Sequence, residues 1–276
     1  MSADTTGSNA PVGIDPTRAS VARVYDALLG GKDNYEIDRK AASEMRAAVP
    51  HVADLAFANR NFLIRLCRFM ASQTDITQYL DCGSGLPTAE NTHQVVQRIN
   101  PESKVVYVDN DPVVLAHGRA LLEEDDRTKL VDADIYEPRS VLEHPVVVNH
   151  LDWSQPIALF QLATLHSYTG PRHRPAEIMR EYIDALPSGS YVAISHVFDA
   201  EDDNTPAVRA LVEAASKGTL GRGSSRTRKE IEELFNGVEL VEPGVVLAED
   251  WWSDGPRLKP PNIGQQLVAG GVGRKP

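Results

Sequence analysis

The chain is poor in cysteine and shows no metal-binding pattern. It has only two cysteines among its 276 residues, Cys67 and Cys82. Two thiols exclude a disulfide framework and a cysteine-rich metal site. None of the eight histidines is followed by another at a spacing of four residues, which would place both on one helical face. We therefore expect no metal ion.

Long apolar runs and an excess of positive charge are also lacking. The runs that begin at Pro145 and Pro156 are far shorter than the ~20 residues of a membrane span. The first seven residues have neither the basic nor the apolar region of a secretory signal. Acidic residues outnumber Lys and Arg by 39 to 28, whereas broad nucleic-acid binding needs a basic surface. We expect a cytoplasmic protein that binds neither nucleic acid nor membrane. Its oligomeric state is left open.

The composition is that of a globular chain, with 42% hydrophobic and 24% charged residues. Residues 1–14 are small and polar, which predicts a disordered tail. Residues 15–75 carry apolar side chains at helical spacing and predict a helical extension, or lid. Residues 76–276 follow as the main domain. The three predicted helices of the extension cover residues 15–29, with Asp15 as N-cap before Pro16, residues 36–48 and residues 52–72.

Beyond residue 76, short apolar runs alternate with helical stretches. This alternation predicts an α/β fold with a mostly parallel sheet. The predicted strands are 77–82, 104–109, 129–133, 157–163 and 191–197. The predicted helices are 88–99, 112–123, 139–144, 176–186, 206–216 and 228–235. Two extended runs, 245–252 and 265–272, predict an antiparallel terminal hairpin, which makes seven strands.

The strongest chemical signal is the segment Asp81-Cys-Gly-Ser-Gly85, between a predicted strand and a predicted helix. Gly83 and Gly85 let the backbone pass close to a ligand, where a side chain would collide. The third glycine of the dinucleotide fingerprint is replaced by Thr88. Asp81 would repel a pyrophosphate, but it would hold the cationic amino group of S-adenosylmethionine. The alternative is a tight turn with an acid that caps it.

Acids also end the next two strands. The strand ending at Asp109 starts about 20 residues after the glycines, where a carboxylate can accept both ribose hydroxyls. This feature fits NAD and S-adenosylmethionine equally. Asn110 and Asp134 complete the predicted cofactor site, Asp134 where an adenine amino group would lie. The alternative for Asp109 and Asp134 is an exposed acid, and Asp111 is expected to cap a helix.

Other chemistries lack their motifs. The chain has neither the phosphate-binding loop Gly-x-x-x-x-Gly-Lys-Ser/Thr nor the hydrolase elbow Gly-x-Ser-x-Gly. No tyrosine is followed four residues later by lysine, the pair of short-chain dehydrogenases. No Asn/Asp-Pro-Pro-aromatic tetrad follows the fourth strand, which weakens the case for an amino-methylating nucleic-acid enzyme.

Three segments resemble a family of S-adenosylmethionine-dependent methyltransferases found in many bacteria and long catalogued as a domain of unknown function. They are RVYDALLGGKDNY (23–35), DCGSGLPTAENTH (81–93) and VVYVDNDPVVLAH (105–117). The resemblance covers about residues 14–250. It implies a class I, seven-stranded Rossmann-like methyltransferase fold. This chain departs from the family pattern at Cys82, Ser84, Gln161 and residues 167–173.

The resemblance implies methyl transfer from S-adenosylmethionine, and we expect direct SN2 transfer to an unidentified small molecule. The sulfonium is already an activated leaving group, so alignment supplies most of the catalysis. Candidate bases are His166 and His196, at the expected ends of the fourth and fifth strands, and Tyr25. A packed structural role is the alternative for each histidine. The alternative functions are a NAD-dependent oxidoreductase and a non-catalytic S-adenosylmethionine-binding regulator.

Further candidates lie in the helical extension. Arg60 is expected to pair with the methionine carboxylate, the alternative being a solvated helix arginine. Gly30 and Gly31 break the first helix, and a polar turn follows. This pattern predicts a lid in which Asn34 and Tyr35 meet the substrate. The alternative is a helix C-cap followed by an exposed loop.

Overall fold

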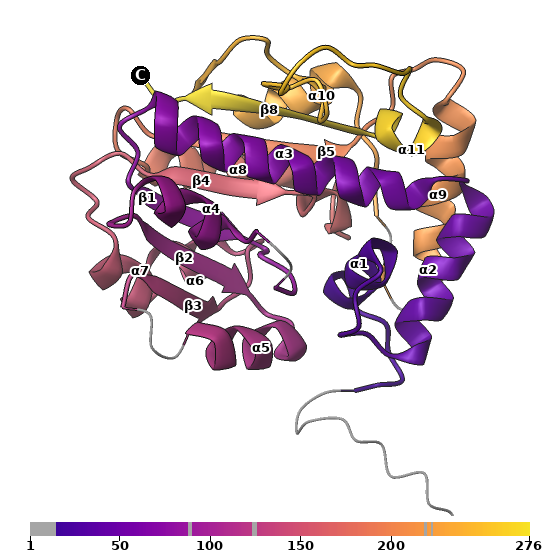
Figure 1. Cartoon of the computed structure of the whole chain (residues 1–276), viewed down its shortest axis with the longest axis horizontal. Helices are drawn as coiled ribbons and strands as arrows, with labels where there is room; N and C mark the ends of the chain where they lie inside the picture. The colour runs from indigo at the N-terminus through magenta and orange to yellow at the C-terminus, as the bar shows by residue number, and fades with distance from the viewer. Residues whose placement is uncertain (1–14, 88–89, 123–125, 218–219, 222) are drawn as a thin grey trace, which may run out of the picture.

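An eight-stranded sheet forms the centre of the computed structural model, which describes residues 15–87, 90–122, 126–217, 220–221 and 223–276 (Figure 1). The strand order is β3-β2-β1-β4-β5-β8-β6, and β7 pairs with β8 outside this path. The first five strands are parallel, whereas β8 runs antiparallel to β5, β6 and β7. The strands are β1 (Gln78–Cys82), β2 (Lys104–Asp109), β3 (Thr128–Asp132), β4 (Ala158–Leu162), β5 (Tyr191–Val197), β6 (Glu239–Leu240), β7 (Val246–Leu247) and β8 (Val268–Arg274).

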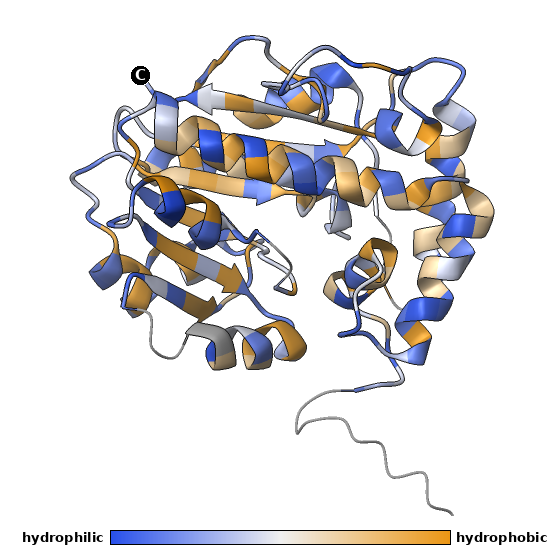
Figure 2. Cartoon of the chain, viewed as in Figure 1, coloured by the Kyte–Doolittle hydropathy of each residue, from blue (hydrophilic) through white to orange (hydrophobic). Residues whose placement is uncertain are grey.

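Helices cover both faces of the sheet, so its inner strands are buried almost throughout. Much of their length is apolar (Figure 2). Each face has its own buried cluster, because alternate residues of a strand point to opposite sides. One face packs against α3 (Val52–Gln73) and α4 (Thr92–Ile99). The other packs against α6 (Pro138–Leu142), α7 (Pro145–His150), α8 (Arg174–Ala185) and α10 (Arg228–Glu232). Helix α5 spans Pro112–Leu122. Three short helices complete this part of the fold: η1 (Leu165–Ser167), η2 (Glu233–Phe235) and α11 (Ile263–Gln266).

Three helices stand beyond the carboxyl ends of the parallel strands: α1 (Val21–Leu29), α2 (Glu36–Ala48) and α9 (Thr205–Ser216) (Figure 1). Their apolar sides join the same buried cluster as α3 and the sheet. The helical segment 15–75 therefore shares a core with the strands that follow it. Among the helices described, none has both the length and the apolar character that crossing a membrane requires.

The structure confirms the mostly parallel sheet with antiparallel C-terminal strands. The two terminal runs do pair, although only Val246 and Leu247 of the first run take part. The count of seven strands was wrong, because β6 adds an eighth. Sequence reasoning missed β6 since it has two exposed residues and no alternation. It also missed α7 and α11, which are short. Residues 1–14, predicted to be a disordered tail, lie outside the described residues, as do residues 88–89 at the predicted start of α4.

The first helix starts later than predicted. It begins at Val21, and the side chain of Ser20 accepts a hydrogen bond from the backbone N–H of Arg23. Asp15, the predicted cap, instead accepts hydrogen bonds from the backbone N–H and the hydroxyl of Thr17, at 2.9 and 2.6 Å. A short acidic side chain offers the backbone this local turn in competition with the helix.

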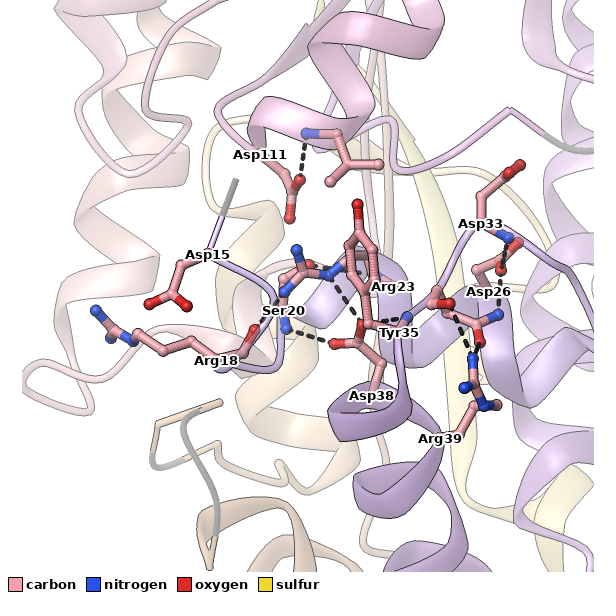
Figure 3. A network of polar contacts seen from close by, with 12 residues as sticks. Asp15, Arg18, Ser20, Arg23, Asp26, Asp33, Tyr35, Asp38, Arg39 and Asp111 are labelled. Atoms are coloured by element: carbon pink, nitrogen blue, oxygen red, sulfur yellow. Dashed lines mark hydrogen bonds and ion pairs between the residues drawn. The ribbon is translucent and has the colours of Figure 1, made fainter. Parts of the chain in front are cut away.

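The carboxylate of Asp38 joins the starts of α1 and α2. It is fully buried. Its Oδ1 accepts from the backbone N–H of Ser20 at 3.0 Å, and its Oδ2 accepts from that of Tyr35 at 2.9 Å. Arg23 Nε lies 3.0 Å from Oδ2, and its guanidinium stacks on the Tyr35 ring (Figure 3). One buried ion pair therefore sets the position of both helix starts.

We expect Arg23→Met to destabilise the protein by about 3–5 kcal/mol, because the substitution leaves the Asp38 carboxylate buried without its counter-charge. Urea unfolding at neutral pH measures this change. The matched control is Arg180→Met, which removes one partner of an exposed pair with Asp184 and should cost about 1 kcal/mol or less. Equal effects of the two substitutions would contradict the structural role given to Asp38.

Candidate functional site

A cavity of about 450 Å³, here called the main cavity, lies where the parallel strands end. In an open parallel sheet this is the edge at which ligands bind. Its walls come from the loops after β1 to β4 and from α1 and α3. Many of the residues predicted for the site line it: Tyr25, Arg60, Asp81, Gly83, Gly85, Asp109, Asn110 and Asp134.

The glycine turn fits tightly against its neighbours. Gly83 has φ of 76° and donates its backbone N–H to Val108 O at 2.7 Å. A Cβ at this position would lie 2.4 Å from Cγ2 of Thr164. Gly85 has φ of 67°, and no atom lies within 4 Å of the place its Cβ would occupy. Gly83 is thus required for packing, whereas Gly85 leaves space beside the main cavity.

Asp81 is the second-last residue of β1 and is buried. Thr92 Oγ1 donates to its Oδ2 at 2.6 Å. Burial raises the pKa of Asp81 to about 6, although the Thr92 hydroxyl and the charge of Arg60 act in the opposite direction. A carboxylate under such conditions is stabilised by a cationic partner. The main cavity therefore has room and electrostatic preference for a positive group next to Asp81.

Asp109 is held by the backbone on both of its oxygens. Its Oδ2 accepts from the N–H of Gly85 at 2.9 Å, and its Oδ1 accepts from that of Asp111 at 2.9 Å. Burial raises the pKa of this carboxyl also. Each oxygen keeps a lone pair for a further donor, which suits a pair of ligand hydroxyls. Asp111 accepts from Val113 N–H at 2.8 Å, as its predicted capping role requires.

The loop after β3 forms another wall. Asp134 is half-buried, and its Oδ1 accepts from the N–H of Tyr136 at 2.9 Å. Tyr136 donates its hydroxyl to Thr164 O at 2.9 Å, and both residues line the main cavity. Asn110 lines it too and is exposed. Sequence reasoning missed Tyr136, because a single tyrosine in a loop carries no pattern.

Two of the residues predicted from the helical extension, Arg60 and Tyr25, line the main cavity, and their side chains form hydrogen bonds. Arg60 donates from Nη2 to Glu90 O at 2.9 Å and to Asn91 Oδ1 at 3.1 Å. Tyr25 donates its hydroxyl to Ala56 O at 2.9 Å. Burial raises the pKa of Tyr25, so this phenol stays protonated at neutral pH.

Asn59 is a further residue that sequence reasoning missed. Its Nδ2 donates to the Tyr25 hydroxyl at 3.1 Å, and its Oδ1 accepts from Ser195 Oγ. It therefore links α1 to β5 at the wall of the main cavity. The available signal was a polar residue among the apolar positions of the third helix.

The two histidines do not line the main cavity. His196 is fully buried, and its Nδ1 lies 2.8 Å from Val197 O. The ring of His166 contacts that of His196 with 5.8 Å between centroids. Burial lowers the pKa of His166 to about 4 and holds that of His196 well below its usual value, so both are neutral at neutral pH. His166 lines a second, smaller cavity.

Asn34 and Tyr35 also lie outside the lining of the main cavity. Asn34 Nδ2 donates to Asp26 Oδ2 at 2.7 Å and to Gly31 O at 3.0 Å, which closes the turn after α1. Tyr35 packs with Leu86 and with the start of α5. Both residues thus shape the segment beside the main cavity without reaching into it.

The described residues fit a nucleoside ligand with a cationic group. Asp81 favours the cation, Asp109 has lone pairs for ribose hydroxyls, and the space at Gly85 admits close approach of a ligand. The volume lies within the range of about 300–1,000 Å³ that is usual for small-molecule sites. No group of three or more His, Cys, Asp or Glu residues that could hold a metal ion occurs in the part of the chain that is described.

Comparison with known proteins gives the same result. The family model described as S-adenosyl methyltransferase matches residues 7–276. A solved structure from Thermobifida fusca, assigned as a methyltransferase, is 42% identical, with a TM-score of 0.91, and the match covers 97% of this chain and 99% of that one. A DUF574 family protein from Streptomyces avermitilis is 36% identical, with a TM-score of 0.88 and coverage of 95% and 99%.

A search of curated proteins finds no match. The matches to the family and to these two structures extend over almost the whole chain, including the helical segment and the glycine turn. The chain therefore belongs to the S-adenosyl methyltransferase family, and it is a Rossmann-like methyltransferase that uses S-adenosylmethionine.

Proposed function

We propose that the chain transfers the methyl group of S-adenosylmethionine directly to a small-molecule acceptor. The observation that carries the proposal is the convergence of Asp81, the turn at residues 83–85 and Asp109 on one cavity at the strand ends. The family match supports methyl transfer over a nicotinamide-dependent oxidation. A net charge of −11 favours a small acceptor over nucleic acid.

We assign the cofactor contacts by charge and position. Asp109 accepts hydrogen bonds from the ribose hydroxyls, and Asp81 pairs with the amino group. Arg60, which lines the same cavity, pairs with the methionine carboxylate. Asn110 and Asp134 border the adenine. The cofactor, when bound, supplies a methyl group already activated on a sulfonium. The chain's own part is to align the acceptor and to exclude water.

We assign the segment from Tyr25 to Tyr35 as a lid. Tyr35 packs against Leu86, Val113 and Val114, so it closes one side of the glycine turn. Asn34 acts indirectly, because its amide holds the turn of the lid onto Asp26. Tyr25 contributes a hydrogen-bonded wall. Its protonated phenol is not a base at neutral pH.

Asp109→Ala is expected to weaken the binding of S-adenosylhomocysteine by about 1.5–3 kcal/mol, the scale of a hydrogen bond to a charged group. Isothermal titration calorimetry measures the change. Asp132→Ala is the matched control, because Asp132 is an exposed acid at the end of the neighbouring strand, and its affinity should match that of the wild type. Unchanged affinity in Asp109→Ala would remove Asp109 from the site.

Asp81→Asn is expected to stabilise the ligand-free protein while weakening S-adenosylhomocysteine binding. The pKa of Asp81 is raised to about 6 from an ordinary value of 3.8. Between these two pH values, Asp81 keeps its proton in the folded protein and loses it in the unfolded chain. The protonated carboxyl contributes its full stability below the unfolded-state pKa of 3.8. This contribution is lost as the pH rises through the folded-state pKa of about 6. The neutral amide of Asp81→Asn should therefore raise the free energy of unfolding by up to about 3 kcal/mol at pH 7.5 and change it little near pH 4.

Urea unfolding at the two pH values measures this difference. Asp75→Asn, a change at an exposed acid, is the control and should stay within about 0.5 kcal/mol at both. An equal effect of Asp81→Asn at both pH values would contradict the assignment of a strained, desolvated carboxylate at the end of β1.

Hydrogen exchange tests the lid. Amides of residues 25–35 should exchange more slowly when S-adenosylhomocysteine is added, because a ligand in the main cavity restrains the segment that closes it. Protection at residues 81–87 reports occupancy of the glycine turn, and α8, on the opposite face of the sheet, is the reference that should not change. Protection at residues 81–87 alone would show that the segment does not act as a lid.

A further inference from the structure

A second cavity of about 100 Å³, here called the apolar chamber, adjoins the main cavity. Val21, Tyr25, Ala163 and Ser167 line both cavities, so they form the boundary between them. The chamber is lined by α1, α2, α3 and α9, by the loop that follows β4, by the end of β5 and by residues 220–221 and 223–224. It therefore lies on the side of the proposed cofactor site that the helical segment covers (Figure 1).

The wall of the apolar chamber carries no charge among the residues that the structure describes. Of the described residues that line it, none is Asp, Glu, Lys or Arg. Apolar side chains from four helices line it: Val24, Leu28, Met45, Leu55, Leu211 and Val212. A charged molecule that entered would lose its hydration without gaining a counter-charge from these described side chains. The wall therefore selects for neutral and apolar compounds.

His166 is a polar exception in that wall. Its Nδ1 is buried and has no hydrogen-bond partner among the described residues. Burial lowers the pKa of His166 to about 4, so the ring is a neutral imidazole at neutral pH. A neutral imidazole has one nitrogen with a free lone pair. Because Nδ1 is buried whereas the ring as a whole is only half-buried, we take Nε2 as the nitrogen that accepts a proton from a bound hydroxyl.

We propose that the apolar chamber holds the methyl acceptor, and that this acceptor is an uncharged, ring-sized molecule with a hydroxyl group next to His166. This inference rests on the proposed function, because the boundary residues place the chamber beside the methyl donor. An aliphatic amine is a poorer fit, since it would enter as a cation and find no carboxylate among the described lining residues. At about 100 Å³ the chamber is smaller than the apolar protein cavity of about 150 Å³ that holds benzene. A single ring would therefore fill it and extend past the boundary residues toward the main cavity.

The acceptor hydroxyl, S-adenosylmethionine and His166 account for every bond and proton of the methyl transfer. The acceptor oxygen forms a bond to the methyl carbon, and the carbon–sulfur bond breaks with its electron pair left on sulfur. The hydroxyl proton passes to His166 and from there to solvent. An alkylated hydroxyl is a far stronger acid than an imidazolium, so a histidine of low pKa can still accept the proton.

Methionine methyl NMR can test the inference without turnover. The chain has four methionines, and Met45 lines the apolar chamber. Met70 and Met179 are buried elsewhere in the core and serve as internal references. With the protein saturated by S-adenosylhomocysteine, phenol should shift the Met45 methyl signal in a saturable way and leave the references in place. Benzoate, a ring of similar size that carries a charge, should have no such effect.

A pair of substitutions on α9, one that fills the chamber and one that does not, provides a matched test. Val212→Phe places a ring into the chamber from a half-buried position on α9, whereas Glu213→Phe adds the same ring on the exposed side of that helix. Val212→Phe should raise the dissociation constant of phenol by about 10-fold or more, because the room for it is gone. Glu213→Phe should leave that constant unchanged, and both variants should bind S-adenosylhomocysteine as the wild type does.

Each outcome bears on a defined claim. S-adenosylhomocysteine binding without a Met45 response to phenol would overturn the acceptor assignment alone. An equal response to benzoate, or an unchanged phenol constant in Val212→Phe, would overturn it too. If calorimetry shows no binding of S-adenosylhomocysteine to the wild type, the proposed function is wrong, and the acceptor assignment is wrong with it.

Discussion

The parallel pairing of β1 with β2 determines the geometry of the site. In this register Asp81 lies opposite Tyr107, and Cys82 lies opposite Val108. The chain then turns at once, and the N–H groups of Gly83 and Ser84 both donate to Val108 O, at 2.7 and 3.2 Å. These two hydrogen bonds place Gly85 beside Asp109, whose Oδ2 accepts from the N–H of Gly85. A slip of two residues along the strand would move the two acids by about 6.6 Å relative to each other and separate the groups that the ligand must meet at once.

The sequence predicted the parts of the fold that are periodic and long. The helix over residues 36–48 and the strands over 104–109 and 191–197 agree with the structure at both ends. It did not predict elements whose existence depends on tertiary contacts. β6 is two residues long and exists because Glu239 and Leu240 pair with the end of β8. The first helix was misplaced because Asp15 and Ser20 are both suitable caps, and only the buried carboxylate of Asp38 decides between them.

The site was predictable where the fold itself brings residues together. Carboxyl ends of adjacent parallel strands meet at one edge, which is why Asp81, Asp109 and Asp134 line one cavity. His196 shows the limit of that argument. It is the second-last residue of β5, but it shares the face of Val192 and Ile194, which pack under α8 away from the main cavity. The alternation along the strand contains this information, whereas position at the strand end does not. The side chain of Asn34 is directed to Asp26 by the turn after α1. No local sequence pattern reveals that contact.

The desolvated carboxylate of Asp81 also makes ligand binding a proton-linked event. Without a ligand, burial holds part of the population protonated near pH 6. A cation placed beside this carboxylate lowers its pKa and expels the proton. Affinity for a cationic ligand then rises with pH up to about that value, and each binding event releases a fraction of a proton to the buffer. The heat of binding thus includes the ionisation enthalpy of the buffer, and its variation between buffers counts the protons released as the ligand meets Asp81.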